Sequence, residues 1–439
     1  MVFLKSIQLG LIHGAIAITL VPINSTLNRI MIEDLGISAT VVVLLFSLPY
    51  LLSFIQVAIG SFSDRHPLAG YRRTPYIIAG LLLCVAGLLM ATQVAALITQ
   101  NFWLGVAFGL LTFGAWGMGF NFATVSYFSL ASELSGEKNR GKVTAIMFFI
   151  MIVSIIITAA GLSRMLESFS PEQLQRAFQT VAAVALIIGL LGIVGLEPRR
   201  RALHTSEERY SLPAIVREVF SNRQVALFFF YLILMLAAIL GQDVLLEPFA
   251  ARAFDLPVDA TTRITSIWGG FYLISLAVAG ALEDRFSKIR IARLAAWGAI
   301  AAFLLIAVSG LAASKGMFYA GVVLLGLATG PATVSNLSLM LDMTVPGKVG
   351  LFIGAWGAAS AFARLLGSFT TAVVRDIGRL APDGALFGYI AAFLLEVGFL
   401  AASLVILQKI DVNLFKRQAS ADASYNPSVV ERAALGGEA

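Results

Sequence analysis

Residues 60–65 read Gly60-Ser61-Phe62-Ser63-Asp64-Arg65, and the same glycine, aspartate and arginine recur as Gly280-Ala281-Leu282-Glu283-Asp284-Arg285. The two copies stand 220 positions apart in a chain of 439 residues. A second match pairs residues 123–133 with residues 332–342 at an offset of 209. Two copies of one unit, each about half of the chain, predict a protein built from two similar halves.

The repeat lies in an unusually apolar chain. Hydrophobic residues make up 59% of it, charged residues 13%, and the mean hydropathy is +0.88. So low a share of charge excludes a soluble globular or a disordered protein. Continuous apolar runs argue against a transmembrane β-barrel, whose strands alternate. The net charge of +6 is not gathered in an aromatic-rich basic patch, so we expect no nucleic-acid partner.

The apolar runs are long enough to be membrane spans, since a helix needs ~20 residues to cross the hydrocarbon core. We expect an all-α polytopic membrane protein with twelve spans, at 7–31, 38–62, 75–98, 102–131, 143–166, 176–196, 224–247, 263–283, 291–313, 316–341, 350–374 and 384–408. Twelve spans in a parallel repeat predict the major facilitator superfamily fold. The predicted organisation is an N-terminal six-helix half (1–196), a cytoplasmic linker (197–223), a C-terminal six-helix half (224–408) and a cytoplasmic tail (409–439).

The basic residues predict the orientation of the chain in the membrane. Of the 31 lysines and arginines, 22 fall in the N-terminus, the C-terminal tail and the loops on their side. Eight fall on the opposite side, and Arg364 lies inside a span. Because cytoplasmic loops carry the excess of positive charge, we expect both termini in the cytoplasm.

The repeated loop is a candidate gating element. Its glycines would let helix ends approach closely, and its aspartates could accept hydrogen bonds from helix-end amides and basic groups across the two halves. The alternative is that its arginines only fix the topology. The predicted gating-loop residues are Gly60, Asp64, Arg65, Arg72, Arg73, Gly280, Asp284 and Arg285.

Polar side chains inside the spans are the candidate ligand-binding residues, because an ionisable group there costs roughly 2.5–3.5 kcal/mol on insertion scales. These candidates are His13, Asn24, Asn28, Arg29, Asn121, Gln242, Asp243, Glu247 and Arg364. The alternative for His13 is a hydrogen-bonded packing residue. The alternative for Asn121 is close helix packing beside the glycines of its span.

Helical spacing predicts how the charged candidates pair. Arg29 and Glu33 are four residues apart, so they can form an ion pair on one face. Asp243 and Glu247 are also four apart, so together they could carry a proton, or pair with an arginine such as Arg29. We expect Pro248 to end or kink this span.

Arg364 sits in the middle of its span among small residues, and it therefore needs a partner. We expect it to face the bundle interior, a cavity, or a carboxylate such as Glu396 of the last span. A structural ion pair and recognition of an anion are equally open alternatives.

Enzymatic and metal-binding motifs are missing from the sequence. Cys84 is the only cysteine, which excludes an intramolecular disulfide and CxxC metal sites. The chain also shows no nucleotide-binding glycine loop after a strand and no nucleophile–base set, so we expect neither an enzyme nor a bound metal ion.

Three stretches carry a family resemblance. They are Leu27-Asn28-Arg29-Ile30-Met31-Ile32-Glu33-Asp34-Leu35, the run Ser63-Asp64-Arg65-His66-Pro67-Leu68-Ala69-Gly70-Tyr71-Arg72-Arg73-Thr74-Pro75-Tyr76-Ile77, and Gln242-Asp243-Val244-Leu245-Leu246-Glu247-Pro248-Phe249. These resemble the span-1, first-loop and span-7 signatures of the PucC/LhaA family. That family is the bacteriochlorophyll-delivery branch of the major facilitator superfamily.

The resemblance implies a role in assembling light-harvesting antennas. The protein would bind chlorophyll or bacteriochlorophyll as cargo and deliver it to antenna polypeptides, in contact with membrane lipid and with pigment-synthesis enzymes. His13 could supply an axial ligand to the pigment magnesium, and so could Asn24, Asn28, Asn121 or Gln242. The membrane would be the plasma, intracytoplasmic or thylakoid membrane.

Two other functions stay open at this point. One is a secondary transporter of a small amphipathic or anionic solute, coupled to protons through Asp243 or Glu247, with Arg364 as the counter-charge. The other is a pigment-free scaffold that holds antenna helices during assembly.

Overall fold

A computed structural model describes residues 2–198, 220–282, 285–343, 349–381, 384–412 and 414. These residues are almost entirely helical, and eleven of the helices are long and apolar enough to cross a membrane. The chain is therefore an integral membrane protein, as its composition predicts. Most of the predicted linker and tail, at 199–219 and 415–439, lies outside the described residues.

The helical elements follow one another along the chain with short connections. In order they are α1 (Val2–Ile18), η1 (Pro22–Leu27), η2 (Ile30–Asp34), α2 (Ala39–Phe46), α3 (Leu48–Leu51), η3 (Leu52–Ile55), α4 (Gln56–Arg65), α5 (Thr74–Gln100), α6 (Phe102–Met165), α7 (Pro171–Ile193), α9 (Arg223–Gly241), η4 (Gln242–Val244), α10 (Leu246–Phe254), α11 (Val258–Leu282), α12 (Lys288–Leu311), α13 (Lys315–Asp342), α14 (Val349–Gly378) and α15 (Gly384–Leu407).

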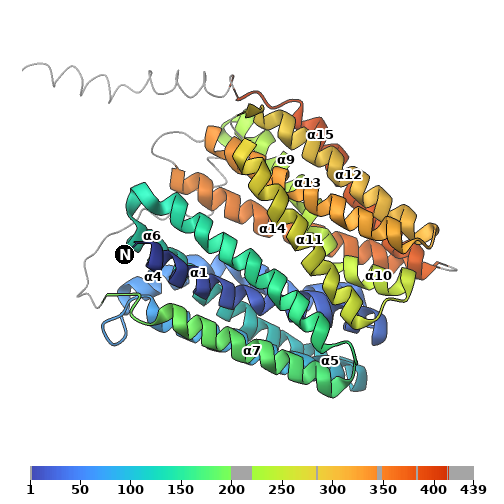
Figure 1. The fold of residues 1–439 in the computed structure, drawn as a ribbon, viewed down its shortest axis with the longest axis horizontal. Helices are drawn as coiled ribbons and strands as arrows, with labels where there is room; N and C mark the ends of the chain where they lie inside the picture. Colours follow the sequence, from blue (N-terminus) through green and yellow to red (C-terminus); the bar gives the residue numbers. More distant parts are fainter. Residues whose placement is uncertain are drawn as a thin grey trace, which may run out of the picture.

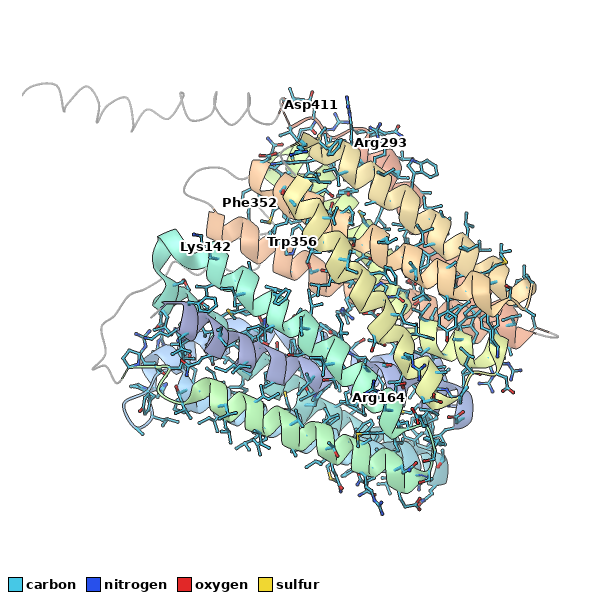
Figure 2. All side chains as sticks on the ribbon, in the orientation of Figure 1. Lys142, Arg164, Arg293, Phe352, Trp356 and Asp411 are labelled. Carbon is cyan, nitrogen blue, oxygen red and sulfur yellow. The ribbon has the colours of Figure 1, made fainter. Side chains whose placement is uncertain are left out.

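Helix α6 contains two of the predicted spans. Its 64 residues would measure about 96 Å if straight. The rings of Phe128 and Phe148 lie 6.2 Å apart, whereas a straight helix would separate them by about 30 Å. The helix therefore folds back on itself between them. Figure 2 shows Lys142 and Arg164 at opposite ends of its second arm.

The second predicted span, 38–62, is not one helix. It is divided into α2, α3, the 3-10 turn η3 and α4. The first division falls at Ser47, two residues before Pro49, which has no backbone N–H to donate and whose ring crowds the carbonyl four residues earlier. Among the described residues eleven of the expected spans are found as continuous helices, and 38–62 is the one that is not among them.

The buried apolar side chains form two cores. One is built almost wholly from residues before 200 and the other from residues after 220. Figure 1 shows the earlier helices in one group and the later helices in another, with α6 and α11 side by side between them. Helices α2 and α14 form a second contact between the two groups.

Glycines allow the closest helix approaches. A Cβ atom on Gly80 would stand 2.5 Å from the backbone nitrogen of Ala123 and 2.6 Å from the Gly119 carbonyl oxygen. A side chain there would force α5 away from α6. At Gly280 no described atom lies within 4 Å of such a Cβ, so the close approach expected at this loop glycine is absent from the described part of the chain.

Candidate functional site

The first span changes its helix type where its polar residues begin. After α1, the segments η1 and η2 are π-helical, and the Leu35 amide donates to the carbonyl oxygen of Ile30, five residues earlier. Such wide turns are frequent at functional sites. We call the end of the bundle where η2 finishes the Asp34 end, and the opposite end, where α1 begins, the Val2 end.

A small polar pocket lies between the two groups of helices. Its volume is about 20 Å³, which is room for a single water molecule. Its walls come from η1 and the residue after it, from α2, α3 and the residue between them, and from η4 and α14. The lining residues are Asn24, Asn28, Val43, Phe46, Ser47, Tyr50, Asp243, Val244, Arg364 and Ser368. The pocket therefore brings together four of the nine candidate ligand-binding residues.

Arg364 and Asp243 form the charged wall of the pocket. Arg364 Nη1 donates to Asp243 Oδ2 at 2.8 Å, and the guanidinium lies 4.9 Å from the centre of the Tyr50 ring. Gln242 Nε2 donates to the other carboxylate oxygen of Asp243 at 2.8 Å. Arg364 therefore faces a cavity and a carboxylate, as expected, and that carboxylate is Asp243 on η4 rather than the Glu396 named as an example.

Asn28 closes the pocket from the first span. Its Nδ2 donates to the backbone carbonyl of Val244 at 2.7 Å, a bond that joins the two halves of the chain. The residue is 1% exposed, and its Oδ1 has no hydrogen-bond partner within the described ranges. A buried acceptor without a donor is costly, so this atom offers an unused contact to a ligand or a water.

Asp243 and Glu247, expected to stack on one helix face, bond to different partners. The 3-10 turn η4 and the start of α10 intervene between α9 and Glu247, so the spacing of an α-helix does not apply. Glu247 instead lies 2.7 Å from the hydroxyl of Thr265, which is itself 3.1 Å from Ser25 Oγ. The helix is broken at 242–245, and Pro248 stands in the first turn of α10, where proline is tolerated.

A second cluster of charges joins the halves at the Asp34 end. Arg375 Nη2 donates to Glu33 Oε1 at 2.8 Å and to the Tyr389 hydroxyl at 3.1 Å, and that hydroxyl also bonds to Glu33. Arg29 pairs with Asp34 and donates to the Leu256 carbonyl at 3.3 Å. The expected Arg29–Glu33 pair was wrong, because the π-helical turns change which residues share a face.

Asp376 caps α2 from across the interface. Its carboxylate accepts hydrogen bonds from the backbone amides of Ala39 (3.1 Å) and Thr40 (2.8 Å) and from the hydroxyls of Ser38 (2.6 Å) and Thr40 (2.7 Å). A carboxylate at a helix N-terminus satisfies amides that have no partner within the helix. The start of α2 is therefore fixed by the second half of the chain.

The predicted gating loop makes its described contacts inside the first half. Arg73 donates to Glu133 at 3.0 and 3.1 Å and to Ser63 at 2.7 Å, and Glu197 accepts from the backbone amides of 72–74. In the second half, Lys288 pairs with Asp342 at 2.8 Å. Asp342 is the repeat equivalent of Glu133, so the repeat preserves an ion pair at this place.

Other members of the loop give less information. Arg65 and Arg285 are exposed. Asp284 and the side chain of Asp64 lie outside the described residues, so the expected contact of these aspartates stays a prediction.

The remaining candidate residues lie apart from the pocket. His13 is 6% exposed and packs among the rings of Tyr127, Phe128 and Phe148, with centroids 5.0–5.4 Å away. This enclosure leaves no room for a tetrapyrrole ring against the imidazole, so His13 does not fit the axial-ligand role. Asn121 donates to the carbonyls of Pro49 (2.9 Å) and Gly117 (2.8 Å), which is a packing role.

An apolar groove opens next to the polar pocket, between α2–α3 and α14. Its volume is about 290 Å³, and Ser47 lies on the wall of both spaces. The lining residues are Leu44, Ser47, Leu51, Phe362, Leu365, Leu366, Phe369 and Thr370. Leu44, Leu51, Phe362 and Phe369 are 40–56% exposed, so the groove faces the hydrocarbon of the membrane.

This bundle of two groups of spans, with a small polar pocket between them, has the major facilitator fold. The nucleoside transporter NupG superposes with a TM-score of 0.68 at 14% identity, over 92% of this chain and 98% of that one. The D-xylose-proton symporter superposes with a TM-score of 0.65 at 13% identity, over 91% and 97%. The predicted fold class is thereby confirmed.

The chain belongs to the PUCC protein family, whose model matches residues 26–415. Protein PucC of Cereibacter sphaeroides is 30% identical over 421 residues, which cover 92% of this chain and 91% of that protein. The bacteriochlorophyll synthase 44.5 kDa chain of Rhodobacter capsulatus is 27% identical over 419 residues, 91% and 96% of the two chains. The resemblance seen in the sequence is confirmed.

Several residues of the site escape sequence reasoning. Tyr50, Ser47 and Ser368 carry no charge, so they do not stand out in apolar spans. The Ser47-Leu48-Pro49 sequence does signal a helix break, and Ser47 and Tyr50 flank it. Asp376 stands near the end of its span, where a charge needs no special explanation, so its capping role required the structure.

Proposed function

We propose that this protein is an assembly factor for light-harvesting antennas, which binds (bacterio)chlorophyll and delivers it to antenna polypeptides. The observation that carries the proposal is membership of the PUCC family across residues 26–415, with relatives that include a protein named as a bacteriochlorophyll synthase chain. The partners would be antenna polypeptides and, during loading, enzymes of pigment synthesis. Membrane lipid would surround the complex.

The polar pocket supports this function through its chemistry. The pocket is lined by hydrogen-bond donors, on the side chains of Arg364, Ser47, Tyr50 and Ser368. Such donors suit a ligand with carbonyl groups, which pigment rings and esters carry. The unpartnered Oδ1 of Asn28 offers one acceptor. A ligand that is mostly apolar needs few such contacts, which agrees with the small number of polar groups gathered here.

The experiment is a complementation in a phototroph from which its own family member has been deleted. Expression of this chain should restore the antenna absorption band of whole cells, because delivery of pigment limits antenna assembly. Wild-type levels of antenna in the deletion strain without this chain would overturn the proposal. Restoration by a protein that purifies without pigment would favour the scaffold function instead.

A second function is favoured by two buried carboxyls. Glu396 is 0% exposed and neither of its oxygens has a partner in the described ranges, and Glu247 is 5% exposed. Intramembrane carboxyls of this kind mark proton relays in transporters. Proton-coupled transport of a small solute predicts uptake into vesicles driven by a pH gradient and lost in Asp243→Asn and Glu396→Gln variants.

A further inference from the structure

The polar pocket and the apolar groove are two compartments of one site. Ser47 lines both, at the point where α2 ends and the chain breaks before Pro49. Arg364 opens into the pocket, while Phe362, Leu365 and Leu366 of the same helix line the groove. A molecule with a polar group and a hydrocarbon chain could therefore contact both compartments by passing Ser47.

The sizes of the two compartments determine which part of a ligand each can accept. The pocket, at about 20 Å³, admits a group no larger than a water or a single carbonyl. The groove, at about 290 Å³, is lined by leucine and phenylalanine side chains. The hydroxyl of Thr370 is already bonded to the Leu366 carbonyl at 2.6 Å, so it offers no free donor to the groove. The groove therefore suits a hydrocarbon chain and the pocket suits the polar group at its end.

From this geometry we propose that the protein holds its pigment by the esterified hydrocarbon tail. The tail lies in the groove between α2–α3 and α14, and the ester carbonyl at its end faces Ser47 and Arg364. The tetrapyrrole ring stays outside the pocket, which is too small for it, and remains accessible to an antenna polypeptide. This inference rests on the function proposed above and adds the part of the pigment that is recognised.

Hydrogen-bonding geometry at the junction agrees with this arrangement. The Arg364 side chain keeps 22% of its surface exposed although one of its nitrogens is bound to Asp243. Its guanidinium carries five N–H donors, so donors remain for an ester carbonyl. Because the groove faces hydrocarbon, a tail gains van der Waals packing against the leucine and phenylalanine side chains, and the polar contact at Ser47 and Arg364 sets its register.

The test compares tail-bearing bacteriochlorophyll a with its tail-free acid, bacteriochlorophyllide a, on the purified full-length protein in mild detergent. Pigment retained per protein after gel filtration gives the affinity of each. We expect bacteriochlorophyllide to bind at least about tenfold more weakly, and free phytol to displace bacteriochlorophyll, because only the tail packs against the side chains of the groove.

Two tryptophan variants locate the contact. Leu366→Trp fills the groove and should weaken bacteriochlorophyll binding about tenfold, whereas Ile377→Trp, on the same helix at a 63% exposed position outside the groove, should leave it within about twofold. Both proteins must keep the wild-type elution profile and Tm.

Equal binding of both pigments, or undiminished binding by Leu366→Trp, would overturn the tail-holding inference and leave the proposed function in place. The tail-holding inference would also be overturned by a phospholipid that stays bound in the groove when phytol is added. Failure of the wild-type protein to bind either pigment would instead count against the proposed function itself.

Discussion

Arg364 Nη1 lies 2.8 Å from Asp243 Oδ2, and this ion pair joins the middle of α14 to the break between α9 and α10. Both side chains are partly exposed to the polar pocket, by 22% and 28%. The pair therefore stabilises the break and at the same time presents charge to whatever enters between the two halves. A charged pair inside a membrane bundle marks a functional site.

Removing one partner of this pair should destabilise the protein. Asp243→Asn leaves the Arg364 guanidinium without its carboxylate, and we expect the free energy of unfolding to fall by about 2–3 kcal/mol, less than for a fully buried pair because of the partial exposure. Denaturant titration in mixed micelles measures the change. Asp255→Asn, at an exposed left-handed position that asparagine tolerates, is the control and should change it by less than about 0.5 kcal/mol. A loss in Asp243→Asn no larger than in this control would contradict the role of the pair.

The charge cluster at the Asp34 end predicts which of two substitutions lowers the stability of the protein more. Arg375 is 3% exposed on its side chain and bonds to both Glu33 and Tyr389. Arg375→Gln leaves the half-buried Glu33 carboxylate without its cation, with only the Tyr389 hydroxyl as a partner, and should cost about 3 kcal/mol. Tyr389→Phe removes one hydroxyl and should cost about 1–2 kcal/mol. The same titration checks the order, and a larger loss in Tyr389→Phe would show that the ion pair is not what holds this end together.

Capping of α2 by Asp376 should be measurable independently. Asp376→Asn keeps the shape of the side chain but replaces one accepting oxygen by an NH₂ group, which cannot accept from the Thr40 or Ala39 amides. We expect a loss of about 1–2 kcal/mol of stability, the usual effect of losing an N-cap. Asp255→Asn again serves as the matched control. Equal stability of the two variants would mean that the cap is replaced by water.

The charge distribution predicts a membrane orientation that thiol labelling can test. Cys84, the native cysteine, is fully buried, so single cysteines can be added against a low background. His66→Cys and Arg285→Cys should react with a membrane-impermeant maleimide only after cell lysis. Ser168→Cys and Lys315→Cys, on the opposite side, should react in intact cells. The reverse pattern would place both termini outside the cytoplasm.

The sequence predicts the architecture well because hydropathy and the repeat are properties of composition and order alone. Runs of ~20 apolar residues locate the spans, and a buried polar residue stands out among them. For that reason Asn24, Asn28, Asp243 and Arg364 could be selected before the structure was known, and all four line one pocket.

The sequence could not predict which of the charged residues pair with one another. The rule that residues four apart share a face holds for an α-helix, and here the critical segments are π-helical (η1, η2) or 3-10 (η4). Arg29 therefore pairs with Asp34 rather than Glu33, while Asp243 bonds to Arg364 and Glu247 bonds to Thr265. Contacts such as Ser38 with Asp376 join residues far apart in sequence, and no local pattern encodes them.

The most direct test of the central claim is the pigment content of the protein purified in mild detergent from a phototroph, measured by absorption and mass spectrometry. The wild type is compared with the double variant Asp243→Asn, Arg364→Gln, which removes both charges of the pocket together, and with His13→Ala, which lies outside it. We predict near-stoichiometric (bacterio)chlorophyll in the wild type and in His13→Ala, and at least about tenfold less in the double variant. Wild-type protein without pigment, or pigment lost in His13→Ala and kept in the double variant, would contradict the account.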